Sequence, residues 1–121
     1  MPIKKVLIVD DSPTERYYLT ELLTKSGFEV SQAESAEDAM TKLQGDLPDL
    51  ILLDVVMPGQ NGFQFTRQLS KDPATQLVPI IICTSKTQQT DRIWALRQGA
   101  RDFLTKPVRP DDLLEKIAAL G

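Results

Sequence analysis

The strongest constraint on the fold of this chain is a set of short apolar runs that alternate with helix-length segments. Three of these runs are almost continuously aliphatic, which is typical of strands buried on both faces of a parallel sheet. The predicted strands are Lys4–Val9, Glu29–Ala33, Leu50–Asp54, Ile80–Thr84 and Phe103–Thr105. Because long segments separate them, we expect parallel strands joined by right-handed crossovers.

The segments between the strands carry helix start signals. Ser12-Pro13-Thr14-Glu15 has the pattern of a capping box with proline at the first helical position. Ser35 precedes an apolar stripe with helical spacing. Further helices are predicted over Asn61–Lys71, Gln88–Gln98 and Pro110–Leu120. A strand and a helix therefore repeat five times, which predicts an α/β fold in which a parallel sheet is the middle layer of a three-layer sandwich.

Length and composition exclude several classes of protein. A chain of 121 residues has room for one domain, so we expect a single domain over residues 1–121 without an output domain. One cysteine, Cys83, and no histidine exclude a disulfide framework, a Cys-rich zinc site and histidine-based catalysis. The net charge of −3 argues against autonomous binding of nucleic acid. No signal peptide or membrane-length apolar run is visible, which predicts a cytoplasmic protein without membrane insertion.

Polar side chains follow four of the five predicted strands. Asp10 and Asp11 follow the first strand and Asp54 ends the third. Thr84 ends the fourth strand and Lys106 follows the fifth. Because ligands bind beyond the carboxyl ends of the strands in open α/β sheets, these side chains are expected to converge on one site.

A crowded group of carboxylates needs compensation by positive charge. Two carboxylates about 5 Å apart repel by roughly 3 kcal/mol at an effective dielectric constant of 20. Lys106 and a divalent cation would relieve this repulsion, and an all-oxygen site suits Mg²⁺. The same groups can stabilise a transferring phosphoryl group, with Asp54 as the nucleophile and Thr84 as a hydrogen-bond donor.

These residues resemble the receiver domain of bacterial response regulators (CheY-like) along the whole chain. The matching motifs are Asp10-Asp11, Asp54 with Met57-Pro58-Gly59 and Asn61-Gly62, Thr84, and Lys106-Pro107. The resemblance implies a flavodoxin-like, doubly wound sheet with the strand order 2-1-3-4-5.

The resemblance also implies a role for each site residue. Asp54 would be the phosphorylated residue, with Thr84 and Lys106 in contact with the phosphoryl group and a cis peptide before Pro107. Thr84 and Phe103 would form the switch, although Phe103 is also compatible with a simple core position. The implied ligands of Mg²⁺ are Asp10, Asp11, Asp54 and the backbone carbonyl of Val56.

Several stretches resemble the pilus-associated branch of the family, the stand-alone regulators of the PilH and PilG type. They are Asp11–Glu15, Asn61–Gln64, Thr66–Leu69 and Arg97–Asp102. This resemblance implies a CheA-like histidine kinase as phosphodonor and a pilus motor or regulator as downstream partner in twitching motility. We expect a monomer, because no dimer interface is legible in the sequence, and we expect Mg²⁺-dependent self-phosphorylation and autodephosphorylation to be its only chemistry.

Other functions remain as alternatives. The protein could be a phosphate sink for the kinase rather than an effector. A phosphatase of the haloacid-dehalogenase type needs a second carboxylate two residues after the nucleophile, where this chain has Val56. A flavodoxin-like carrier of FMN is disfavoured because Asp10 and Asp11 would repel its phosphate. A receiver-like module that only binds partners is disfavoured by the complete acidic set.

Two side chains outside the site also carry predictions. Trp94 lies off the apolar stripe formed by Ile93, Leu96 and Ala100, which predicts partial exposure of its ring. Cys83, near the end of a buried strand, is expected to be a small core residue rather than a redox thiol.

Overall fold

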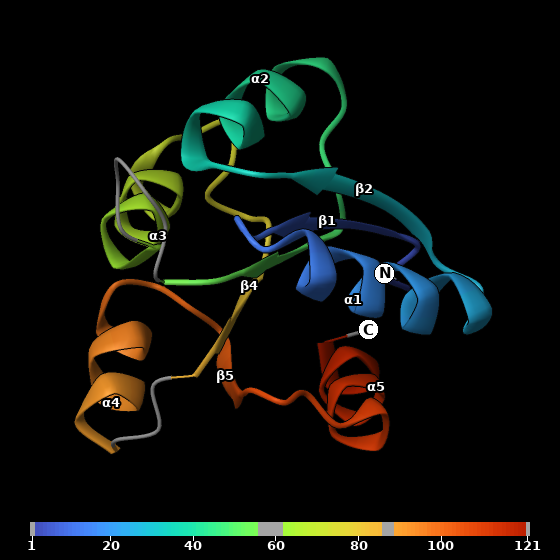
Figure 1. The fold of residues 1–121 in the computed structure, drawn as a ribbon. Helices are drawn as coiled ribbons and strands as arrows, with labels where there is room; N and C mark the ends of the chain where they lie inside the picture. The colour runs from blue at the N-terminus through green and yellow to red at the C-terminus, as the bar shows by residue number, and fades with distance from the viewer. Residues whose placement is uncertain (1, 56–61, 86–88, 121) are drawn as a thin grey trace.

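The structure is a computed structural model that describes residues 2–55, 62–85 and 89–120. Strands and helices alternate along these residues (Figure 1). The elements are β1 (Lys5–Val9), α1 (Pro13–Lys25), β2 (Glu29–Ala33), α2 (Ala36–Gly45), β3 (Leu50–Leu53), α3 (Gly62–Lys71), β4 (Ile80–Thr84), α4 (Gln89–Arg97), β5 (Asp102–Thr105) and α5 (Pro110–Leu120).

The five strands form one parallel sheet in the order β2-β1-β3-β4-β5. This topology confirms the predicted α/β class and the strand order that the family resemblance implies. The chain moves outward from β1 in one direction to β2 and in the other to β3, so β1 and β3 are neighbours at the switch point. In their register Val9 pairs with Leu53, which places the residues that follow these two strands side by side.

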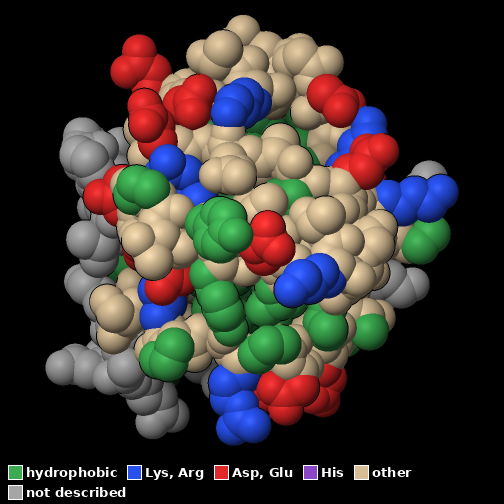
Figure 2. Space-filling view, turned by 45° about the vertical axis from the view of Figure 1, so that its right-hand side comes forward, with side chains coloured by type: hydrophobic (Ala, Val, Ile, Leu, Met, Phe, Trp, Pro, Cys, Tyr) green, Lys and Arg blue, Asp and Glu red, His purple; other side chains and the backbone are tan. Residues whose placement is uncertain are grey.

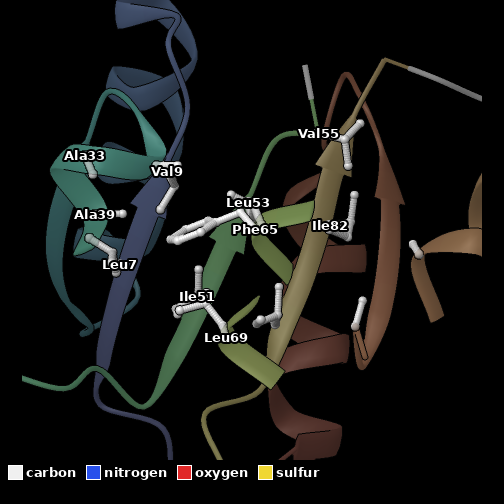
Figure 3. Close-up of a cluster of buried hydrophobic side chains, with 14 of the residues drawn as sticks. Leu7, Val9, Ala33, Ala39, Ile51, Leu53, Val55, Phe65, Leu69 and Ile82 are labelled. Atoms are coloured by element: carbon white, nitrogen blue, oxygen red, sulfur yellow. The ribbon is translucent and has the colours of Figure 1, made fainter. Parts of the chain in front are cut away.

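Helices cover both faces of the sheet, with α1 and α5 on one face and α2, α3 and α4 on the other (Figure 1). Successive residues of β1 alternate between the two resulting cores: Leu7 and Val9 face one core, and Val6 and Ile8 face the other. Burial on both faces explains why the central strands are continuously apolar. Figure 3 shows the first core, where Phe65 of α3 packs against the strands.

The side of the molecule that carries α1 and α5 is shown in Figure 2, where hydrophobic side chains gather in the lower half of the view. On this side α1 exposes Tyr17 and Tyr18. The Tyr18 hydroxyl also donates a hydrogen bond of 2.7 Å to the backbone oxygen of Val108, between β5 and α5. This bond ties α1 to the segment that includes Lys106.

Three strand boundaries differ from the prediction by one residue. β1 begins at Lys5 rather than Lys4, and β5 begins at Asp102 rather than Phe103. β3 ends at Leu53, so Asp54 lies just beyond the strand instead of at its last position. The Asp54 amide still donates to the Val9 carbonyl oxygen at 3.0 Å, which keeps the backbone of Asp54 next to β1.

The predicted helices are confirmed, with small differences at their ends. α4 ends at Arg97 rather than Gln98, because the chain turns at Gly99, whose φ of 107° favours glycine. The predicted starts Asn61 and Gln88 lie outside the described residues. No helix in the described part of the chain is long and apolar enough to cross a membrane.

The apolar stripe predicted for α4 is partly wrong. Trp94 is 50% exposed, as predicted, but Ile93 and Leu96 are also 46% and 43% exposed. The helix instead meets the core through Ala95, a small side chain that allows close approach to the sheet. Burial of Cys83 is confirmed, and burial raises the pKa of its thiol to about 12, so the thiol stays protonated near neutral pH.

Candidate functional site

Three carboxylates meet where β1 and β3 end. Asp10 and Asp11 follow β1 and Asp54 follows β3, and one carboxylate oxygen from each lies within 4.8 Å of the others. Asp10 is 2% exposed and Asp54 is 8% exposed, whereas Asp11 is open to solvent. The predicted convergence of these side chains is therefore present in the structure.

Lys106 supplies positive charge directly between two of these carboxylates. Its Nζ donates to Asp10 Oδ2 at 2.6 Å and to Asp54 Oδ2 at 3.1 Å. Its backbone amide donates to the Thr84 carbonyl oxygen at 2.8 Å, which connects the lysine to the end of β4. Burial lowers the pKa of Lys106, but the hydrogen bond to Asp10 and the charges of Asp54 and Asp10 outweigh burial and raise it overall. The lysine is therefore charged at neutral pH.

The charges of this site are not balanced by Lys106 alone. One ammonium against three carboxylates leaves two negative charges, which a single divalent cation would neutralise. The donor atoms on these side chains are all oxygens, the ligand type that Mg²⁺ prefers. The residues present therefore fit a divalent metal ion.

Hydrogen bonds with backbone groups hold Asp10 in place. The Ser12 amide donates to Asp10 Oδ1 at 2.9 Å, and the Asp10 amide donates to the Ala33 carbonyl oxygen at 3.0 Å. Ser12 Oγ caps α1 by accepting from the Glu15 amide at 3.3 Å, as predicted. The reciprocal half of the capping box is wrong, because the Ser12 amide donates to Asp10 rather than to the Glu15 carboxylate.

The two residues predicted to form the switch are both buried. Thr84 is fully buried at the end of β4. Phe103 is buried in the core between the sheet and α2, α3 and α4, where β5 pairs with β4. The peptide bond between Lys106 and Pro107 is cis, as the family resemblance implies. Val56 and the motif Met57-Pro58-Gly59 lie outside the described residues.

Gly62, the first residue of α3, contacts the backbone that carries Asp54. Its amide donates to the Val55 carbonyl oxygen at 2.8 Å. A Cβ atom added to Gly62 would overlap backbone atoms of Asp54 and Val55. The sequence analysis placed Gly62 in a family motif at the start of a predicted helix, and the structure shows that α3 approaches the backbone of the site closely at this residue.

We expect Gly62→Ala to lower the free energy of unfolding by about 1–3 kcal/mol, because backbone cannot move as easily as a flexible side chain. Urea unfolding measures the change. Gly45→Ala is the matched control, since nothing lies within 4 Å of a Cβ at that helical glycine. Equal stability of Gly62→Ala and wild type would show that the backbone of Asp54 is not packed against α3.

Arg16 is a residue of this neighbourhood that the sequence analysis missed. Its Nη1 donates to the Asp10 backbone oxygen at 2.7 Å. Arg16 lies in the helix that begins after Ser12 and belongs to none of the motifs named for the site, so no feature of the sequence distinguished it from other helical residues.

Comparison with known proteins gives one consistent family. The family described as response regulator receiver domain matches residues 6–118. Protein PilH of Pseudomonas aeruginosa is 53% identical over 116 residues, which is 96% of each chain. Response regulator PleD of Caulobacter vibrioides is 40% identical, and the match covers 26% of that longer protein.

Solved structures agree with this assignment. The chemotaxis response regulator CheY4 of Vibrio cholerae superposes with a TM-score of 0.90 at 31% identity, covering 98% of this chain and 99% of that chain. A CheY-like receiver domain protein of Methanospirillum hungatei gives 0.84 at 29% identity, covering 97% and 92%. The fold, the acidic site and these relatives all agree. The chain belongs to the response regulator receiver domain family.

Proposed function

We propose that this protein is a stand-alone response regulator of a chemotaxis-like phosphorelay that controls type IV pili and twitching motility. A histidine kinase of the CheA-like class would phosphorylate it on Asp54. The observation that carries the proposal is the position of the Asp54 carboxylate, 3.1 Å from the Lys106 ammonium and beside two further carboxylates. The pilus assignment is supported by the 53% identity to PilH over 96% of both chains.

In this mechanism Asp54 is the nucleophile. Its carboxylate oxygen attacks the phosphorus of the donor and forms an acyl phosphate. The bond from phosphorus to the donor breaks in the same transfer, and the electron pair leaves with the imidazole nitrogen of the kinase histidine, or with the acetate oxygen when acetyl phosphate is the donor. A Mg²⁺ ion held by Asp10, Asp11, Asp54 and the Val56 carbonyl would neutralise charge on the phosphoryl oxygens when bound. Lys106 keeps its ammonium next to Asp54 and stabilises the same oxygens.

The protein would then be the acceptor and the switch, with self-phosphorylation and autodephosphorylation as its only chemistry. The added phosphoryl oxygens are acceptors toward which the Thr84 hydroxyl turns, and Phe103 fills the space that Thr84 leaves. A change from 1% to 99% active state requires about 5.5 kcal/mol of preference for the active state. Such a preference would come from charge-assisted hydrogen bonds to the phosphoryl group.

A surface on α4 supports signalling through contact with a separate protein. Ile93, Trp94 and Leu96 are all partly exposed on this short helix, which follows the strand that ends in Thr84. Exposed apolar side chains of this kind mark protein interfaces.

We place the protein in the cytoplasm as a monomer, where an ATP-dependent kinase would meet it.

The direct test is phosphorylation by a small-molecule donor. Incubation with acetyl phosphate and Mg²⁺ is expected to add one phosphoryl group, seen by mass spectrometry of the intact protein, and chelation of the metal is expected to prevent it. An unchanged mass in the presence of Mg²⁺ would contradict the proposal. A pull-down with the phosphorylated and unphosphorylated protein separates the effector from the phosphate sink, because an effector captures a partner other than the kinase in its phosphorylated form, whereas a sink captures only the kinase.

A further inference from the structure

Arg16 makes two polar contacts that lie between α1 and the sheet. Its Nη1 donates to the backbone oxygen of Asp10 at 2.7 Å, and its Nε donates to Oε1 of Gln32 on β2 at 3.2 Å. Both contacts are partly buried. Among the residues that the structure describes, no ion pair includes Arg16. The guanidinium is thus used on a carbonyl and an amide although three carboxylates lie nearby.

The carbonyl that Arg16 binds belongs to the peptide unit between Asp10 and Asp11. A rotation of that peptide plane would change the directions of both side chains, because it alters ψ of the first aspartate and φ of the second. On its other side, Asp10 is held by the Ala33 carbonyl, the Ser12 amide and the Lys106 ammonium. Arg16 adds the contact that holds the peptide itself.

We propose that Arg16 is a positioning residue of the acidic site, which sets the directions of the Asp10 and Asp11 carboxylates toward the divalent cation. The inference rests on the proposed function, since the cation is the one that phosphorylation of Asp54 requires. Groups that orient metal ligands from behind change metal affinity about 10- to 100-fold when they are replaced.

The direction of the change in Mg²⁺ affinity distinguishes positioning of the aspartates by Arg16 from a purely electrostatic effect of its charge. A cation near a metal site repels the metal, so if Arg16 acted only through its charge, Arg16→Gln would bind Mg²⁺ more tightly than wild type. If Arg16 positions the two aspartates, the same variant binds Mg²⁺ more weakly. Arg16→Lys keeps the charge but cannot donate to both Asp10 and Gln32 from a rigid planar group.

The experiment is a titration with Mg²⁺ alone, followed by the backbone amide resonances of the protein. We expect Arg16→Gln to raise the Kd for Mg²⁺ about tenfold, with Arg16→Lys between this variant and wild type. The matched control is Lys25→Gln, which removes one positive charge from the other end of α1 and is expected to change the Kd less than twofold. An unchanged or tighter Kd in Arg16→Gln, or full retention of affinity in Arg16→Lys, would overturn the inference.

Two further measurements distinguish loss of Mg²⁺ binding from loss of folding, and failure of this inference from failure of the proposed function. Urea unfolding in the absence of Mg²⁺ shows whether each variant is folded. If Arg16→Gln is unfolded, Arg16→Lys decides, because weaker Mg²⁺ binding supports positioning and unchanged binding contradicts it. The wild type separates this inference from the proposed function. A wild type that neither binds Mg²⁺ nor accepts a phosphoryl group contradicts the function, whereas a competent wild type with an equally competent Arg16→Gln contradicts only the role of Arg16.

Discussion

Asp54→Asn is expected to abolish the gain of a phosphoryl group from acetyl phosphate and Mg²⁺. The amide keeps the size of the side chain but is a poor nucleophile, so no acyl phosphate forms. The fold is expected to remain intact, because Lys106 keeps its 2.6 Å contact with Asp10 and the replacement relieves repulsion among the carboxylates. Intact-mass measurement and urea unfolding of the same sample test both parts.

The control for this variant is Asp111→Asn, which changes an exposed aspartate in the first turn of α5. This protein should be phosphorylated like the wild type, since Asp111 contacts only Arg109 among the ion pairs of the described residues. If the Asp54→Asn variant gained a phosphoryl group, another residue would be the phosphoryl acceptor and the prediction would be wrong. Equal loss in both variants would indicate a general effect of charge rather than loss of the nucleophile.

Lys106→Met is expected to cause a large loss of stability in the absence of metal. The replacement leaves the buried carboxylates of Asp10 and Asp54 without their ammonium partner. Removing one member of a buried ion pair costs about 3–5 kcal/mol, because the remaining charge is desolvated and unpaired. We therefore expect urea unfolding at neutral pH to show a decrease of about 3 kcal/mol in the free energy of unfolding.

Mg²⁺ is expected to restore part of this stability, since a bound cation compensates the same carboxylates. The matched control is Lys116→Met, whose partner Asp102 and own side chain are both about 30% exposed. A partly exposed ion pair of this kind contributes about 1 kcal/mol or less to the free energy of unfolding. If Lys106→Met loses no more stability than Lys116→Met, or if Mg²⁺ fails to stabilise it, the carboxylates do not form a crowded group that binds a cation.

Both predictions concern the same balance of charge. The structure places one oxygen of each of three carboxylates within 4.8 Å of the others, with Lys106 in contact with two of them. Backbone hydrogen bonds to neighbouring strands hold Asp10 and Asp54 in place. Asp54→Asn removes one negative charge and the chemistry, whereas Lys106→Met removes the compensating positive charge and retains the nucleophile. Opposite effects on stability from these two variants would show that electrostatic repulsion is built into this site.

The sequence predicted local features best because their signals are local. Continuous aliphatic runs identified β1, β3 and β4, and the bounds of β2, β4 and α5 agree with those of the structure. The errors in the bounds of the elements are shifts of one residue, at ends where single hydrogen bonds decide the boundary. The α4 stripe failed for a different reason: a helix on the sheet can turn any face inward, and Ala95 packs closer than Ile93 or Leu96.

The site was predictable as a set of residues, but its geometry was not. Alternation of strands and helices implies that the carboxyl ends of parallel strands meet at one edge, so Asp10, Asp54 and Lys106 could be identified before any coordinates were known. The family resemblance, rather than periodicity, supplied the strand order. The pairing of Lys106 with both carboxylates depends on the placement of β5 relative to β1 and β3, a long-range property.

By itself, the sequence determined the alternating elements, the apolar core positions and the chemical types gathered at the strand ends, because side-chain periodicity and composition are properties of neighbouring residues. Only the tertiary structure decided that the Ser12 amide turns to Asp10 instead of Glu15, that Gly62 packs against the Asp54 backbone and that Arg16 holds the Asp10 carbonyl. The Ser12 and Arg16 contacts join residues only two and six positions from Asp10, so they depend on the backbone conformation of the loop after β1, which side-chain periodicity does not determine. The Gly62 contact depends on how α3 is placed against the end of β3.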